Sequence, residues 1–196
     1  MIKEFKIFKK LSTPAKIQDF INKIQINFEE EKETVRSPLM VLKHKKAHCI
    51  EAALLAAAIL WSHGKKPLIL DLKATNEDDD HVIALFKENN HWGAISKTNH
   101  PVLRYRDPIY GSIRELVMSY FNEYFLENRK KTLRSYSDPV DLSKFNKDWL
   151  TSEKNLWQIV KALNSAKHHD ILKPGMGKRL RLADKIELKA SETTEW

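Results

Sequence analysis

Cysteine is almost absent from this chain of 196 residues, which contains only Cys49. A single cysteine excludes an internal disulfide framework, and this is typical of proteins from a reducing compartment. The N-terminal residues contain no long apolar run of the signal-peptide kind. No stretch stays apolar over the roughly 20 residues that a membrane-spanning helix needs. We therefore expect a soluble, cytoplasmic protein without a membrane partner.

The sequence also lacks arginine-rich runs and metal-binding motifs. Lys and Arg number 34 against 26 Asp and Glu, a formal net charge of +8, but the two signs are mixed along the chain. We therefore expect no nucleic-acid partner. No Cys-x-x-Cys or His-Glu-x-x-His spacing occurs. His44 and His48 would share a face if residue 44 were helical, and with Cys49 and His81 they are an alternative zinc site. We expect no metal.

The longest apolar run follows the cysteine directly. Every residue from Ala52 to Trp61 is apolar, which predicts a helix that is buried on all sides. Gly64 supplies a C-cap, and Pro67 blocks any continuation of the helix. Cys49 then lies in the first turn, where free N–H groups and the helix dipole favour a thiolate and can hold an oxyanion. The alternative is that Cys49 is a small buried hydrophobic residue, the commoner role of a lone cysteine.

The remaining patterns alternate between helix and strand, which predicts an α+β fold. Helical spacing of apolar residues predicts further helices over residues 14–28, 113–125 and 149–163. Short apolar runs predict strands over residues 68–72, 81–86 and from 92 onward. Asn89-Asn90 predicts a tight turn between the last two strands, because both residues tolerate positive φ. Ser37-Pro38 marks a break, after which we expect a loop into the cysteine helix.

A thiol nucleophile needs a base that comes from another element and faces the helix N-terminus. His81, at the start of a predicted strand, is suitably placed. A third group must hold its other ring nitrogen.

Residues 37–111 resemble the transglutaminase-like superfamily. Residues 47–53, Ala-His-Cys-Ile-Glu-Ala-Ala, are similar to the nucleophile helix of that family. Residues 80–86 are similar to its histidine strand, and Trp92 matches a tryptophan of the next strand. The resemblance implies a papain-like fold with the cysteine helix on an antiparallel sheet. It also implies amide chemistry through a thioester on a protein or peptide substrate: hydrolysis, deamidation or acyl transfer. This mechanism needs no cofactor, and we expect none. We expect this domain over residues 1–165 and a basic C-terminal extension over residues 166–196.

The third catalytic residue departs from the family pattern. The family's aspartate usually lies near the position of Ser96, where no acid stands, and the nearest downstream acid is Asp107. We assign Cys49 as the nucleophile, His81 as the general base and later acid, and Asp107 as the group that orients His81.

Alternatives to Asp107 follow from strand pairing across the asparagine turn. This pairing puts Ser96 and Thr98 beside His81, with Asn99 just past the strand end. Asp107 could equally be a turn residue before Pro108. Because members with altered sites exist, a catalytically silent protein-interaction domain is the alternative function.

Overall fold

Strand β4 (His81–Glu88) lies between the two hydrophobic cores of the fold. Its successive side chains point to opposite faces of the sheet and so enter the two cores alternately. The computed structural model describes residues 2–29 and 32–194. Val82, Ala84 and Phe86 pack into one core, and Ile83 and Leu85 pack into the other. A strand that is buried on both faces appears in a sequence as an unbroken apolar run, and the strand predicted over residues 81–86 is confirmed.

The sheet around β4 is antiparallel throughout its described pairings. Its strands run in the order β6 (Arg106–Tyr110), β5 (His91–Ile95), β4, β3 (Leu68–Lys73), β7 (Ser135–Ser137) and β9 (His168–Asp170), and β8 (Val140–Asp141) also pairs with β3. The expected α+β class is therefore confirmed. Strand β9 comes from residues 166–196, which the sequence sets apart as a basic extension.

The β4–β5 hairpin has the predicted register. Asn89 and Asn90 have φ angles of 47° and 66°, the left-handed conformation that a two-residue turn requires. Glu88 pairs with His91, and the ladder continues to Ala84 opposite Ile95.

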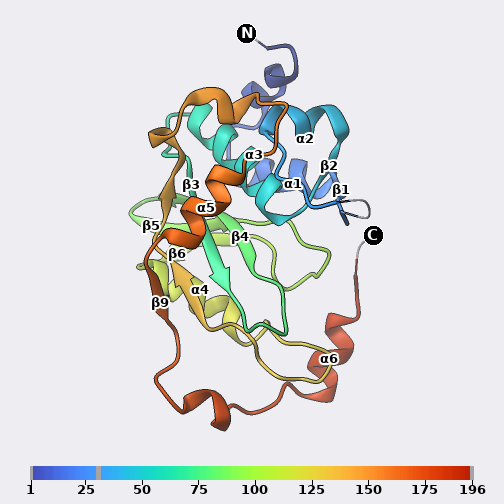
Figure 1. Ribbon diagram of the computed structural model, residues 1–196, viewed down its shortest axis with the longest axis vertical. Helices are drawn as coiled ribbons and strands as arrows, with labels where there is room; N and C mark the ends of the chain where they lie inside the picture. Colours follow the sequence, from blue (N-terminus) through green and yellow to red (C-terminus); the bar gives the residue numbers. More distant parts are fainter. Residues whose placement is uncertain (1, 30–31, 195–196) are drawn as a thin grey trace.

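Helix α3 (Cys49–Ser62) packs on one face of the sheet and is buried on all sides, as its sequence predicts. The same core includes side chains of α1 (Pro14–Asn22), α2 (Pro38–His44) and α5 (Trp157–Ser165). Helix α4 (Ile113–Phe121) contributes to the core on the opposite face. Figure 1 shows α1, α2 and α3 gathered in the upper half, with α4 and α6 (Lys185–Ser191) in the lower half. No helix of the described residues is long and apolar enough to cross a membrane.

Two predictions near the cysteine helix are wrong. The helix expected over residues 14–28 ends at Asn22, and β1 (Gln25–Ile26) instead pairs in parallel with β2 (Lys46–Ala47). The expected loop before the cysteine helix contains α2. The Ser37 hydroxyl caps α2 by accepting a hydrogen bond from Met40 N at 3.3 Å, and Pro38 is the first helical residue. A hydroxyl followed by proline is a helix start, not only a break.

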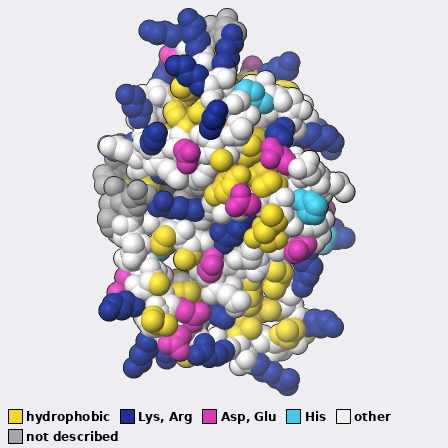
Figure 2. All heavy atoms as spheres, turned by 180° about the vertical axis from the view of Figure 1, so that it is seen from behind, with side chains coloured by type: hydrophobic (Ala, Val, Ile, Leu, Met, Phe, Trp, Pro, Cys, Tyr) yellow, Lys and Arg dark blue, Asp and Glu magenta, His cyan; other side chains and the backbone are white. Residues whose placement is uncertain are grey.

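The chain's excess positive charge is not gathered on the face shown in Figure 2. Lys and Arg side chains are spread over that face and are interspersed with acidic and hydrophobic ones.

Candidate active site

Cys49 lies at the start of α3, as predicted, and is partly buried. The first hydrogen bond of the helix runs from Ala52 N to His48 O, at 3.0 Å. The N–H groups of residues 49–51 therefore precede the intrahelical ladder. Pairing of β2 with β1 holds the chain just before this turn. The thiol thus stands where free N–H groups and the positive end of the helix dipole converge.

His81 begins β4 and is 7% exposed. Its Nε2 lies 2.6 Å from Ser96 Oγ. Ser96 is held in turn by the buried side chain of Gln18 in α1. The Gln18 amide donates to Ser96 O at 2.8 Å, and its oxygen accepts from Ser96 N at 3.0 Å. Helix α1 therefore locks the end of β5, and with it the hydroxyl that meets His81.

The thiol of Cys49 interacts with two imidazoles. Burial alone would raise the pKa of Cys49, but hydrogen bonds with the side chains of His48 and His81 outweigh this effect. Together they lower the pKa of Cys49 from its ordinary 9.0 to about 6. The structure therefore brings Cys49 and His81 together, and the two imidazoles favour the thiolate of Cys49 over the thiol.

The sequence indicates a role for His48 only as a ligand of the alternative zinc site. Burial would lower the pKa of its imidazole, but the hydrogen bond with Cys49 and the charges of Cys49 and Glu51 raise it from 6.5 to about 9. The carbonyl of Thr34, 2.7 Å from His48 Nε2, contributes in the same direction. The only signal in the sequence for a role of His48 at the thiol is that it directly precedes Cys49. The contact with Thr34 could not be predicted, because Thr34 belongs to a separate segment.

Two cavities meet at Cys49. The larger has a volume of about 520 Å³, and the smaller about 290 Å³. Three residues line both: His48, Cys49 and Asp80. His81 and Tyr124 line only the larger cavity, whereas Trp157 of α5 lines only the smaller one. Each cavity therefore reaches Cys49.

The structure does not bring Asp107 to His81. Asp107 is exposed on β6, the edge strand beyond β5, and does not line either cavity at Cys49. Ser96, one of the alternatives, occupies the position beside the ring. Thr98 and Asn99 line the larger cavity, but the hydrogen bond of His81 Nε2 goes to Ser96. The register of the hairpin was the signal that pointed to Ser96.

The described residues contain no group of three or more His, Cys, Asp and Glu side chains that could hold a metal ion. The zinc alternative needed His44 and His48 on one helix face. His44 ends α2, and Lys45 then adopts a left-handed conformation with φ of 55°, so the two histidines belong to different elements.

Comparison with models of known protein families finds no match to this chain, and a search of curated proteins finds no similar sequence.

Proposed function

We propose that this protein is a thiol-dependent hydrolase or acyl transferase with a papain-like, transglutaminase-like arrangement, which acts on an amide bond of a peptide or protein. One observation carries the proposal: the chain's only cysteine begins a buried helix, hydrogen-bonds with two imidazoles and lies where two cavities meet. A cysteine that is only a core residue would have neither the lowered pKa nor access to open space.

In the proposed reaction, the thiolate of Cys49 attacks the amide carbonyl carbon and a C–S bond forms. The N–H of Cys49, at the free end of α3, donates to the oxyanion. An imidazole then donates a proton to the leaving nitrogen as the C–N bond breaks. The thioester that remains is cleaved by water in a hydrolase, or by an amine in a transferase. The two cavities lined by Cys49 suit this scheme, because the acyl part and the leaving group each need space beside the thiol.

We assign His81 to proton transfer with the second nucleophile, the water or amine that cleaves the thioester. In neutral His81, an Nε2 hydrogen donated to Ser96 Oγ leaves the Nδ1 lone pair free to accept a proton. The hydrogen bond at 2.6 Å also fixes the plane of the ring. Ser96 thus takes the orienting part of the role that the sequence assigns to Asp107.

A catalytically silent interaction domain is the second candidate. It is favoured by the group beside His81, which is a hydroxyl rather than a carboxylate. A hydroxyl stabilises an imidazolium less than a carboxylate does. In a silent domain, the paired thiol and imidazoles would be a structural network.

Acyl transfer to the enzyme distinguishes the two candidates. The purified protein is incubated with a mixture of acetylated peptide amides, quenched in acid and weighed intact by mass spectrometry. Because the chain has one cysteine, a mass increase that hydroxylamine removes identifies a thioester on Cys49. We expect such an adduct in the wild type and its accumulation in His81→Gln, where thioester cleavage is slowed. Cys49→Ala, the control, forms none. A wild-type protein that never acylates, yet is alkylated rapidly by iodoacetamide, would support the silent domain.

A further inference from the structure

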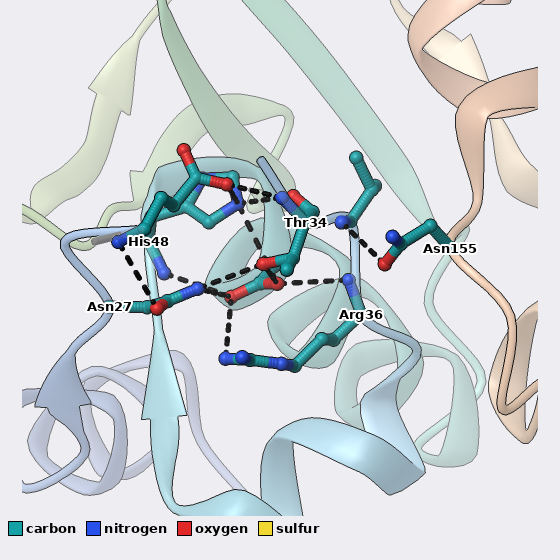
Figure 3. Close-up of polar contacts among 8 residues, drawn as sticks. Asn27, Thr34, Arg36, His48 and Asn155 are labelled. Atoms are coloured by element: carbon teal, nitrogen blue, oxygen red, sulfur yellow. Dashed lines mark hydrogen bonds and ion pairs between the residues drawn. The ribbon is translucent and has the colours of Figure 1, made fainter. Parts of the chain in front are cut away.

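The Nε2 atom of His48 faces three acceptors. Its Nε2 lies 2.7 Å from the Thr34 carbonyl, which can only accept, so Nε2 carries a hydrogen. The same nitrogen lies 3.4 Å from Glu29 Oε1 and 3.6 Å from Glu51 Oε1. Figure 3 shows this ring among the polar side chains around Thr34. By elimination we assign the hydrogen bond with Cys49 to Nδ1, which lies on the side of the Glu51 backbone N–H.

Burial and hydrogen bonds hold the Glu51 side chain in place. Its side chain has no exposed surface. It accepts hydrogen bonds from Thr34 Oγ1 at 2.7 Å, from Arg36 N at 2.9 Å and from His48 N at 3.2 Å. All these partners are donors, as a carboxylate requires. A buried carboxylate therefore lies beside His48, whereas the carboxylate that the sequence predicts beside His81 is not there.

We propose that His48 is a second catalytic histidine, which takes the proton of the Cys49 thiol in the free protein and leaves His81 to act on the second nucleophile. This proposal rests on the proposed function. The comparison of ring partners carries it: His48 faces a carbonyl and two carboxylates, whereas His81 faces the Ser96 hydroxyl. Carboxylates stabilise an imidazolium far better than a hydroxyl does.

The other charged groups around His48 do not reverse this order. Arg36 Nη1 lies 3.9 Å from Glu51 Oε2, the oxygen that also accepts from His48 N. Asp80 lines both cavities with His48, but it is engaged by Lys73 Nζ at 2.8 Å. His81 and His48 both hydrogen-bond with the same thiol.

The proton balance of the cycle follows. The S–H bond of Cys49 breaks and an N–H bond forms on His48. After the thiolate attacks, His48 gives this proton to the leaving nitrogen as the C–N bond breaks. His81 then takes a proton from the water or amine that attacks the thioester, and the C–S bond breaks to restore the thiolate. That proton returns through the site from His81 to His48.

The test is the pH titration of the thiolate by its ultraviolet absorbance, taken for each protein as the difference from its Cys49→Ala counterpart, because the five tyrosines also absorb there when they ionise. We expect an inflection near pH 6 in the wild type. His48→Gln should move the inflection to about pH 8.5 or above, the range of an unassisted or buried cysteine. His81→Gln should move it far less while still blocking thioester cleavage. If His81→Gln causes the larger move, His81 is the thiolate's partner and the proposal is wrong.

A milder pair of variants guards against misfolding of His48→Gln. Glu29→Gln keeps an oxygen that accepts from Thr34 N but removes a negative charge near His48. We expect the inflection to rise by about half a pH unit, as for loss of one partly exposed ion pair. Glu33→Gln is the matched control: it makes the same change on an exposed residue of the smaller cavity and should move nothing. Equal effects of the two variants would refute a specific role for His48. Failure of acylation with an unaltered titration would refute the proposed function alone.

Discussion

Replacement of Glu51 by alanine tests the polar network that underlies the site. Glu51 is fully buried and accepts from Thr34 Oγ1, Arg36 N and His48 N within 3.2 Å, and also from Asn27 Nδ2 at 3.2 Å. Glu51→Ala leaves these donors without their acceptor. A buried donor that loses its partner costs about 1–3 kcal/mol.

Water can reach some of these donors, so the full sum does not apply. Thr34 is buried, whereas Arg36, Asn27 and His48 are only partly buried. Counting about two donors as lost, we expect Glu51→Ala to lower the free energy of unfolding by about 3–5 kcal/mol, the range for a broken buried charge network. Because small domains have a total stability of about 5–15 kcal/mol, this is a large part of it.

The assay is urea unfolding followed by circular dichroism, and the chain offers a matched control. Glu187 has the same position in the first turn of α6 and accepts from Asp184 N in the same way, but its side chain is 41% exposed. Glu187→Ala should cost less than about 1 kcal/mol, because water replaces the carboxylate. Equal losses for Glu51→Ala and Glu187→Ala, or a loss below about 1 kcal/mol for Glu51→Ala, would refute the reasoning.

Three further predictions concern the site and its scaffold. Ser96→Ala should lower the rate of thioester cleavage about fivefold, the worth of one hydrogen bond of about 1 kcal/mol, while the thiolate inflection stays near pH 6; an unchanged rate would remove Ser96 from the mechanism. Gly93→Ala should lower the free energy of unfolding by about 1–3 kcal/mol, since an added Cβ would lie 2.4 Å from Phe86 Cζ and 2.8 Å from Arg106 O; a melting temperature like that of the wild type would contradict this. Chelators should not change the melting temperature, because we expect no bound metal whose removal would destabilise the native state; one equivalent of zinc lost together with stability would overturn the thiol mechanism.

The parts of the fold that follow local pattern were predictable. The apolar run after Cys49 defined α3, and the two asparagines at 89 and 90 set the register of the β4–β5 hairpin. Ser37-Pro38 is the same kind of helix start as Thr13-Pro14, so the break that we predict there is instead the beginning of α2. The length of α1 was overestimated because Ile24 continues its apolar spacing yet lies beyond its end.

The groups around the two histidines could not be found by pattern alone. Asp107 was chosen because it is the nearest downstream acid, but it lies exposed on β6. The residue that clamps Ser96 is Gln18, which is 78 positions away in the chain. Contacts over such separations have no periodic signature, because they arise only when helices and strands pack.

The sequence by itself determined that Cys49 begins a buried helix and that His81 begins a strand, because capping, apolar periodicity and turn chemistry act within a few residues. Only the tertiary structure decided what surrounds them. Packing of α1 against the end of β5 places a hydroxyl beside His81. The folding of residues 27–36 against the first turn of α3 places the Thr34 carbonyl and the Glu29 carboxylate beside His48, where Glu51 of the same turn supplies a second carboxylate. The charge on the His48 imidazole depends on groups such as Thr34 and Glu29, because electrostatic interactions follow distance in space and burial rather than order along the chain.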